Sequence, residues 1–189
     1  MNHLPKISYV QIQTQSRCNA DCIFCPYIES SHAKNPGVMS EDLWFRVLHE
    51  LLIFKENLNK PESLFCPYLM QEPLMDKSIY SKIEDIYKFF PNTCIEIATN
   101  GYLLNEKNRR KLITSVQGKN HRIYISHHGV DKKSLEKIMK INFDKTEENL
   151  LKFIEESSKD ISIRIRGAGS SQDGKHIYFT EKEYMDYWN

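Results

Sequence analysis

Apolar and polar residues alternate with a period of two in four short segments of the chain, and a fifth segment is a short apolar run. Strict alternation is typical of a half-buried β-strand, whereas apolar residues at positions i, i+3, i+4 and i+7 indicate an amphipathic helix. The predicted strands cover residues 9–14, 64–70, 94–99, 122–126 and 161–167. Helical patterns separate them, and a last helical pattern begins at Thr180. This order predicts successive βα units and a parallel sheet.

Capping residues mark the ends of two predicted helices. Ser40 precedes two acidic residues and an apolar stripe, which predicts a helix that begins directly after it. Asn105 predicts the start of a helix over 106–116, and Gly118 predicts its end. Both helices would connect one predicted strand to the next, as the crossovers of a parallel sheet require.

The two parities of the predicted strands carry different residues. The parity expected to pack against the helices is apolar: Val10, Ile12, Ile95, Ile97, Ile123, Ile125, Ile161, Ile163 and Ile165. The opposite parity carries Gln11, Gln13, Glu96, Tyr124, Ser126, Arg164 and Arg166. A closed (β/α)₈ barrel is filled by bulky branched side chains, so a polar inner face favours an incomplete barrel that holds a ligand. We therefore predict an α/β fold of about five βα units, a partial parallel TIM-like barrel. A twisted open sheet with one solvated face is the alternative, although parallel sheets are usually covered on both faces.

Size and composition are those of an ordinary globular domain. The chain has 189 residues, of which 40% are hydrophobic and 27% are charged, and we expect residues 1–189 to form a single domain. Its net charge of +1 gives no electrostatic case for binding nucleic acid or an anionic membrane. No apolar run approaches the roughly 20 residues that span a bilayer, and the first residues lack the apolar core of a secretory signal. We therefore expect a cytoplasmic protein without nucleic-acid or membrane partners.

Three of the five cysteines lie within eight positions, in the segment CNADCIFC that directly follows the first predicted strand. In a reducing compartment, clustered cysteines such as Cys18, Cys22 and Cys25 bind metal more often than they form disulfides. Tetrahedral zinc would need a fourth ligand, for which His32, Cys66 or Cys94 would be available. An iron–sulfur cubane held by three cysteines instead leaves one iron open to a small molecule. Both interpretations are compatible with the spacing.

The cysteine segment and four later segments resemble the motifs of the radical S-adenosylmethionine (SAM) superfamily. In that family an aromatic residue precedes the third cysteine, as Phe24 does here. The later segments follow the family's order: LMQEPL (69–74) at the place of GGEP, ATNGYLL (98–104), ISHHG (125–129) and NFDKTEENL (142–150). The resemblance extends from about residue 7 to 170 and is greatest to the branch whose members carry a C-terminal SPASM-type domain and modify peptides.

This resemblance implies a radical SAM enzyme with a [4Fe–4S] cluster on Cys18, Cys22 and Cys25. In such enzymes the reduced cluster cleaves SAM to a 5′-deoxyadenosyl radical, which abstracts hydrogen from a substrate. The candidates here are a peptide or another small substrate. A reducing protein such as flavodoxin or ferredoxin would supply the electron. Two other functions are compatible with the sequence: a zinc-binding α/β module without redox chemistry, and a radical-SAM-like domain that keeps a cluster but does not catalyse.

The resemblance also assigns residues to SAM. Phe24 would lie beside the adenine, and Glu72 belongs to the segment that meets the SAM amino group. The residues expected near the ribose and the methionine moiety are Thr99, Asn100 and Ser126. The chain departs from the family where Met70 and Gln71 replace the two glycines of GGEP, and where Met139 takes the place of an arginine for the SAM carboxylate. Arg164 or Arg166 would supply that charge instead by a bidentate contact.

The C-terminal part of the pattern is shorter than the family's. Relatives usually build six βα units, whereas five are predicted here, with a last helix that ends at Trp188-Asn189. We therefore expect a C-terminally incomplete radical SAM core, with any auxiliary-cluster domain beyond residue 189. His127 and His128 follow the fourth predicted strand, but the pattern assigns a catalytic role to no residue.

Overall fold

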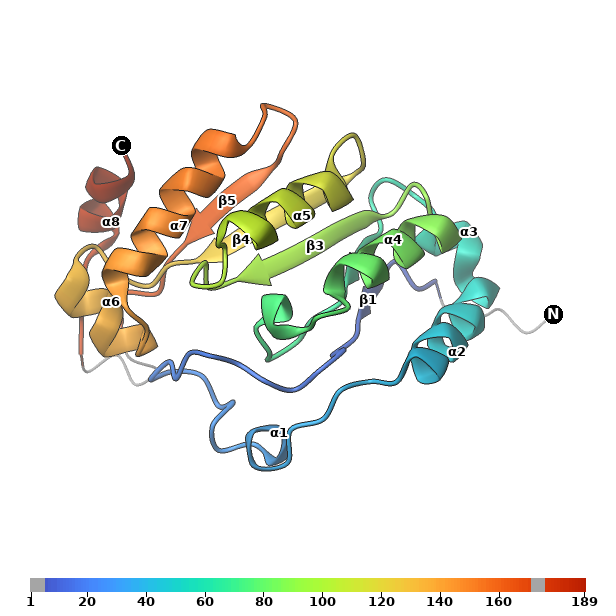
Figure 1. The fold of residues 1–189 in the computed structure, drawn as a ribbon, viewed down its shortest axis with the longest axis horizontal. Coiled ribbons are helices and arrows are strands. Elements are labelled where there is room, and N and C mark those ends of the chain that lie inside the picture. The colour runs from blue at the N-terminus through green and yellow to red at the C-terminus, as the bar shows by residue number, and fades with distance from the viewer. Residues whose placement is uncertain (1–5, 171–175) are drawn as a thin grey trace.

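The five predicted strands form one parallel sheet in the computed structural model, which describes residues 6–170 and 176–189. The strands are β1 (Tyr9–Gln11), β2 (Leu64–Cys66), β3 (Cys94–Thr99), β4 (His121–Ser126) and β5 (Ile163–Arg166). Each strand pairs with the one before it in the chain, so the spatial order is β1-β2-β3-β4-β5 (Figure 1). This sequential order with helical crossovers is that of a partial (βα) barrel and confirms the predicted α/β fold.

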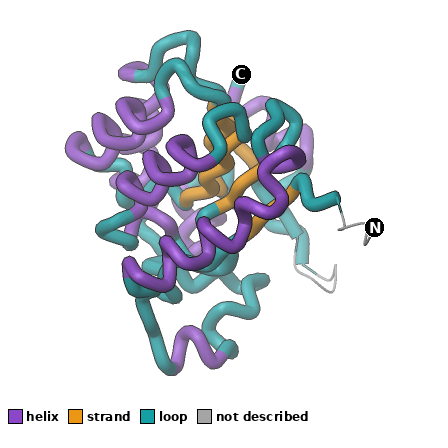
Figure 2. Tube along the Cα trace, turned by 90° about the vertical axis from the view of Figure 1, so that its right-hand side faces the viewer, coloured by secondary structure: helices purple, strands orange, loops and turns teal. Residues whose placement is uncertain are grey.

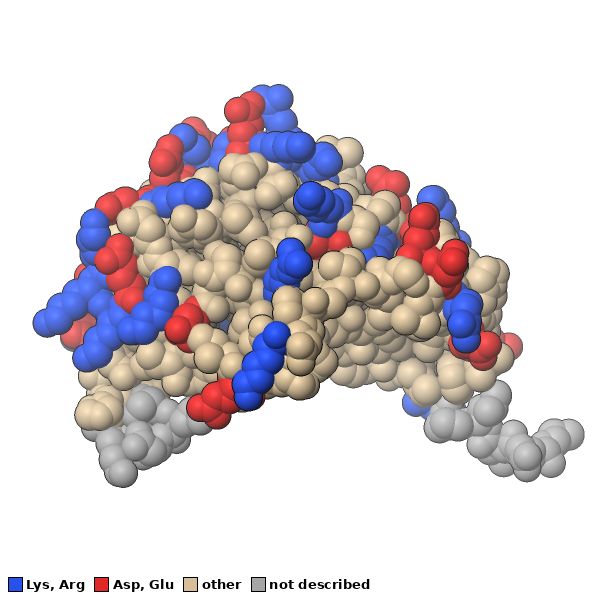
Figure 3. All heavy atoms as spheres, turned by 60° about the horizontal axis from the view of Figure 1, so that its bottom comes forward, with Lys and Arg blue, Asp and Glu red and all other residues tan. Residues whose placement is uncertain are grey.

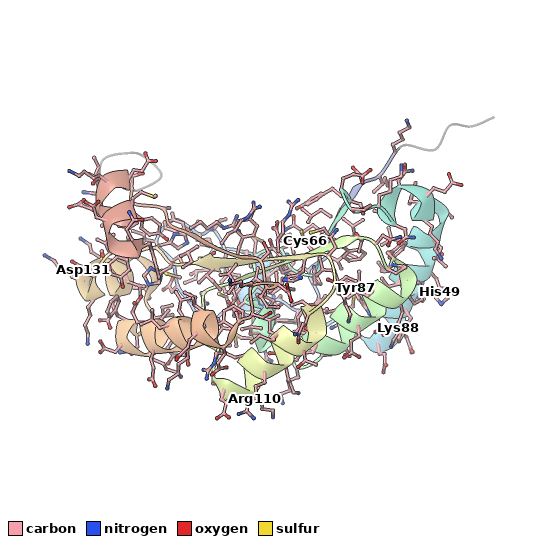
Figure 4. The ribbon with its side chains drawn as sticks, turned by 90° about the horizontal axis from the view of Figure 1, so that it is seen from above. His49, Cys66, Tyr87, Lys88, Arg110 and Asp131 are labelled. Carbon is pink, nitrogen blue, oxygen red and sulfur yellow. The ribbon has the colours of Figure 1, made fainter. Side chains whose placement is uncertain are left out.

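Helices connect the strands. The α-helices are α1 (Ser31–Lys34), α2 (Glu41–Leu51), α3 (Lys55–Leu58), α4 (Ile79–Phe89), α5 (Glu106–Val116), α6 (Lys132–Met139), α7 (Phe143–Glu156) and α8 (Glu181–Trp188), and two 3₁₀ turns are η1 (Leu52–Phe54) and η2 (Pro73–Met75). Helices α4, α5 and α7 cover one face of the sheet, whereas the other face is open in the view from above (Figure 4). The segment between β1 and α2 carries α1 and runs along the lower part of the view in Figure 1, where Figure 2 also shows it projecting from the rest of the fold.

The predicted caps are present. The Ser40 side chain accepts a hydrogen bond from the backbone of Leu43 at the start of α2, and Asn105 caps α5 in the same way. Gly118 has a φ of +71°, a conformation that L side chains rarely adopt, and it follows α5 directly after its C-cap. Local side-chain chemistry therefore sets the ends of these two helices, as the sequence indicates.

The predicted strand parities are confirmed in β3 and β4, the central pair of the described sheet. Ile95, Ile97, Ile123 and Ile125 are buried beneath the helices. The opposite parity, on the open face, is partly exposed in both strands. The core also contains large side chains from the helices and the other strands: Trp44, Leu48, Phe65, Phe90 and Phe153.

Three strands are shorter than predicted. β5 covers Ile163–Arg166 instead of 161–167, and the first two strands are shortened where the chain leaves the sheet. β1 ends at Gln11 instead of residue 14, although the backbone N–H of Ile12 still donates to Cys66 O. Beyond it the chain turns away and Gln15 forms an isolated antiparallel bridge with Val38. β2 ends before Pro67, which has no N–H to donate to a sheet. Both early ends place loops, rather than strand, at the edge where the cysteines lie.

The surface charges are mixed, as the net charge of +1 indicates. Lysine and arginine are interspersed with aspartate and glutamate over the face shown in Figure 3. Within residues 6–170 and 176–189, no helix is long and apolar enough to cross a bilayer.

Candidate functional site

The carboxyl ends of the five strands meet at one edge of the sheet, and an open cleft of about 240 Å³ lies there. The three clustered cysteines line it together with the predicted SAM-binding residues Phe24, Glu72, Thr99, Asn100, Ser126 and Arg166. Active sites of parallel α/β folds occur at this edge because every strand delivers a loop to it. Of the residues predicted to bind cofactor, Arg164 is the one that does not line the cleft.

The cysteine loop is held in place by its backbone and by one tyrosine. Asp21 N donates to Met139 O and Ile23 N donates to Ile138 O, so the loop lies along the end of α6. The Tyr27 hydroxyl donates to Ser16 O at 2.8 Å and accepts from the backbone N–H of Cys18 at 3.2 Å. The loop therefore extends from the end of β1 across to α6, the helix that follows β4.

All three clustered thiols are free and partly buried. The pKa of Cys18 is raised to about 11 and that of Cys22 to about 12, mainly by burial. Nearby negative charges contribute in the same direction, from Glu72 and Cys25 for Cys18 and from Cys18 and Cys25 for Cys22. Metal ligation requires thiolates, and a cationic metal centre between the thiols would stabilise them.

The donor set fits a cluster better than a single ion. Within the described residues, no three His, Cys, Asp or Glu side chains converge so as to hold one metal ion. The proposed fourth zinc ligands are elsewhere: His32 lines a different pocket, and Cys66 and Cys94 are buried in strands. In a cubane each cysteine binds a separate iron, so the three thiols surround one cluster at wider separations than the ligands of a single ion. Cys18, Cys22 and Cys25 meet that requirement because all three line the same cleft.

Glu72 ties the loop after β2 to the end of β3. Its buried carboxylate accepts hydrogen bonds from the Thr99 hydroxyl at 2.6 Å, from Asn100 N at 2.8 Å and from Leu74 N at 3.1 Å. Burial raises the pKa of Glu72 to about 7, although these three hydrogen bonds act in the opposite direction. Through these three donors Glu72 positions the two loops relative to each other.

The TNG segment connects the same edge to the cysteine loop. The Asn100 amide donates to the Asn19 side chain at 3.0 Å and accepts from Tyr102 N at 3.1 Å. Gly101 follows with a φ of +78°, which explains the glycine at this place of the motif. Asn100 thus fixes the first cysteine turn against β3.

Phe24 and His128 form one wall of the cleft. Their rings meet edge to face with centroids 4.7 Å apart. His128 Nδ1 accepts from Ala168 N at 2.8 Å, and burial lowers the pKa of His128 to about 4, with smaller contributions from His127 and Arg166. His128 is therefore a neutral imidazole near pH 7 whose orientation is set by a backbone donor.

Sequence reasoning did not assign His128 or Tyr68 to the site, although both line the cleft. Met139 lines it too, in agreement with its alignment to the family's arginine for the SAM carboxylate. His128 follows Ser126 on the same strand parity, which is a signal that was available for it. The structure adds how Met139 reaches the cleft, because the end of α6 packs against the cysteine loop. Its sulfur accepts from the backbone N–H of His128 at 3.3 Å.

His127 lies outside the cleft. It is completely buried, with Nε2 2.6 Å from Glu147 Oε1, and its ring stacks on Tyr187 at 5.9 Å between centroids. The neighbouring histidines therefore have separate roles: His128 faces the cleft, and His127 joins β4 to α7 and α8.

A family model described as "Radical SAM superfamily" matches residues 12–167, most of the chain. Among curated proteins, the GTP 3′,8-cyclase of Nautilia profundicola is 26% identical over 102 residues, which are 53% of this chain and 30% of that protein. The chain therefore spans about a third of the length of this curated relative.

Solved structures share the fold at low identity. SuiB of Streptococcus suis bound to S-adenosylmethionine has a TM-score of 0.68 at 17% identity and covers 98% of this chain and 39% of its own. BtrN in complex with AdoMet and 2-DOIA has a TM-score of 0.55 at 17% identity and covers 100% of this chain and 84% of its own. At these identities the likeness concerns the fold alone.

The family match includes the cysteine loop and the last strand that contributes to the cleft. The strand order and the three cysteines at the carboxyl edge of the sheet agree with it. The chain belongs to the radical SAM superfamily, whose members use a [4Fe–4S] cluster and S-adenosylmethionine.

Proposed function

We propose that this chain is the catalytic core of a radical SAM enzyme, with a [4Fe–4S] cluster on Cys18, Cys22 and Cys25 and SAM in the adjoining cleft. The observation that supports it is the shared cleft, where the three thiols meet residues from the ends of β3, β4 and β5. When bound, the cluster and SAM supply an electron and a 5′-deoxyadenosyl radical that abstracts hydrogen from substrate. The chain's own residues hold, orient and shield these groups.

The apolar wall of the cleft would receive the adenine and exclude water. Phe24 offers its ring there, and the Ala20 and Met139 side chains belong to the same buried cluster. Exclusion of water protects a radical from side reactions. Ser126, Thr99 and Asn100 provide the polar side of the cleft, which suits the ribose and the methionine moiety.

Arg166 is the arginine we assign to the SAM carboxylate. It lines the cleft, and its guanidinium centre lies 4.2 Å from the centre of the Tyr124 ring, which orients it. A guanidinium group binds a carboxylate through two parallel hydrogen bonds. Arg166 would thus replace the arginine that Met139 displaces from its usual place in the family.

The loop that aligns with GGEP has no glycine at the two positions where the family has them, and a side chain stabilises its turn. The Gln71 side chain accepts from Leu69 N at 3.0 Å and donates to Pro67 O at 3.3 Å, so it completes the turn internally. Glu72 then fixes this turn against Thr99. We propose that backbone carbonyls of this loop meet the SAM amino group, since the Glu72 carboxylate is occupied by protein donors.

Anaerobic reconstitution with iron and sulfide tests the cluster. We expect a brown protein with about four irons per chain, and loss of colour and iron in Cys22→Ala. Cys66→Ala is the matched control and should keep the cluster, because Cys66 is buried in β2 outside the cleft. A colourless chain that retains one zinc after this treatment would instead support the zinc-binding module.

Formation of 5′-deoxyadenosine tests the chemistry. The reconstituted chain, with dithionite or with reduced flavodoxin or ferredoxin, should convert SAM to methionine and 5′-deoxyadenosine, detected by mass spectrometry. We propose a peptide or another small molecule as the substrate. A full cluster without any cleavage of SAM would support the non-catalytic cluster-binding domain.

A further inference from the structure

The open face of the sheet carries three arginines next to the cleft. Arg122 lies on β4, and Arg164 and Arg166 lie on β5, all on the parity that faces away from the core helices. The pairing register sets Tyr124 beside Arg164 and Ser126 beside Arg166. The three cations therefore occupy two adjacent strands on one surface.

Two of these guanidinium groups share a single aromatic ring. The centre of the Arg166 guanidinium lies 4.2 Å and that of Arg164 5.8 Å from the Tyr124 ring centroid, and Arg164 Nη1 donates to the Tyr124 hydroxyl at 3.2 Å. Attraction to the ring fixes both side chains. It also holds two like charges close together, which raises the free energy of the array until an anion joins it.

None of the three arginines forms an ion pair within 4.0 Å with a carboxylate in the part of the chain that the structure describes. Glu96 is the register partner of Arg122 and forms no ion pair with it within 4.0 Å. The Glu96 carboxylate accepts from the Tyr68 hydroxyl at 2.5 Å instead. Ordered, unpaired guanidinium groups have the geometry that carboxylates and phosphates bind in bidentate fashion.

The two β5 arginines differ in position. Arg166 lines the cleft, whereas Arg164 lies two residues earlier on the same strand and does not line it. Ala98, the register partner of Tyr124, also lines the cleft, so only a small side chain stands on β3 beside the tyrosine that both arginines contact. A molecule on this face can therefore reach both the cleft and Arg164.

We propose that the substrate of this protein carries a carboxylate or phosphate group that binds Arg164, with Arg122 as the second cation, and that Arg166 alone serves SAM. This inference rests on the proposed function for its assignment of the cleft to SAM. The proposed substrate is an anion, whether or not it is a peptide. Arg164 and Arg166, which are equivalent candidates in the sequence, thereby receive different ligands.

Calorimetric titration of the purified chain, without cluster or SAM, tests the anion site. The probes are inorganic phosphate and, separately, succinate. We expect at least one of them to bind, and Arg164→Gln to weaken that binding by about tenfold or more, as for loss of a charge-assisted bidentate contact. Arg164→Lys should recover part of the affinity, since it keeps the charge and loses the fork.

Arg110→Gln is the matched control. Arg110 is exposed on α5, on the helix-covered side of the sheet (Figure 4), where it pairs with Glu106 at 2.6 Å. It should change anion binding less than twofold. A stronger response to phosphate identifies a phosphorylated substrate, and one to succinate identifies a carboxylate.

Absence of binding for both anions, or equal weakening in Arg164→Gln and Arg110→Gln, would overturn the proposal. The titration does not depend on SAM chemistry. Failure of the proposed function would therefore appear separately, as a chain that binds the anion but forms no 5′-deoxyadenosine.

Discussion

At the scale of single residues, the site depends on polar side chains that hold loops to one another. Glu72 is the clearest case, because one carboxylate receives donors from its own loop and from the end of β3. A buried donor that loses its acceptor retains its full desolvation penalty. In this chain the glutamate of the family motif holds the loop after β2 to the end of β3, and this contact does not need a bound cofactor.

We expect Glu72→Ala to lower the free energy of unfolding by about 2–4 kcal/mol, since it leaves the Thr99 hydroxyl and the Asn100 N–H without a partner. Urea unfolding followed by circular dichroism measures this. Glu62→Ala, at an exposed position ahead of β2, should stay within about 0.5 kcal/mol of wild type. Similar effects of the two substitutions would show that the Glu72 contacts do not contribute to stability.

Gly129 of the ISHHG segment is required by close packing. A Cβ atom there would lie 2.6 Å from Leu135 N and 2.7 Å from its Cα, so α6 would have to move. We expect Gly129→Ala to destabilise the chain by about 1–3 kcal/mol, as other overpacked sites do. Gly37→Ala is the control, because nothing lies within 4 Å of its Cβ position. Thermal unfolding of both variants compares them, and equal melting temperatures would contradict the packing argument.

At the scale of elements, a buried ion pair joins the loop after β2 to α4. Lys82 Nζ lies 2.7 Å from Asp76 Oδ2, with both side chains almost inaccessible to solvent, and it also donates to Ser78 Oγ at 2.8 Å. Burial acts to raise the pKa of Asp76, but hydrogen bonds from Lys82 and Ser78 outweigh it, and the pKa is lowered. This contact sets where α4 begins after the Glu72 loop.

The pair predicts a pH dependence of stability. Because the Asp76 pKa is lower in the folded chain, its contribution is complete above the ordinary aspartate pKa of about 4 and is lost as the pH falls through the folded value. Urea unfolding between pH 6 and pH 3 should show a smaller loss in Asp76→Asn than in wild type. Parallel curves for the two proteins would refute the assignment.

Removal of the lysine alone should cost more than removal of an exposed one. We expect Lys82→Met to lower the free energy of unfolding by about 3–5 kcal/mol at pH 7, because Asp76 remains as a buried charge without its partner. Lys152→Met removes a lysine from an exposed pair with Glu148 and should change it by less than about 1 kcal/mol. The comparison is made by chemical denaturation.

At the scale of the whole molecule, the fold is a partial (βα) barrel of five strands. Helix α8 packs against the end of β4. The Tyr184 hydroxyl of α8 donates to His127 O at 3.0 Å, and the Trp188 ring meets the His127 ring edge to face at 5.1 Å. Glu147 of α7 contacts the same imidazole. Helix α8 therefore contacts His127, the chain neighbour of His128, which lines the cleft.

We expect Trp188→Ala to destabilise α8, with faster proteolysis near residue 180 and a loss of about 2–4 kcal/mol in the free energy of unfolding. Met185→Ala is the control on the same helix, since its side chain is exposed. Limited proteolysis with mass spectrometry locates the cut. Unchanged protection of α8 in Trp188→Ala would show that its aromatic contacts do not hold the helix.

Sequence periodicity and capping were sufficient for the sheet, the parities of β3 and β4 and the bounds of α5, because each depends on neighbours close in the chain. They failed at the ends of β1 and β2, where the chain leaves the sheet for tertiary partners. The motif order likewise predicted most residues of the cleft, since parallel strands deliver their carboxyl ends to one edge.

The sequence by itself determined the family, the three-cysteine motif and the polar inner face of an incomplete barrel. Only the tertiary structure decided which polar residues are free to bind a ligand. It engaged the Glu72 carboxylate with protein donors, turned His127 into the core and His128 into the cleft, and separated Arg166 from Arg164. The physical reason is that strand parity and motif spacing specify a direction, whereas hydrogen-bond partners and burial depend on segments that are distant in the chain.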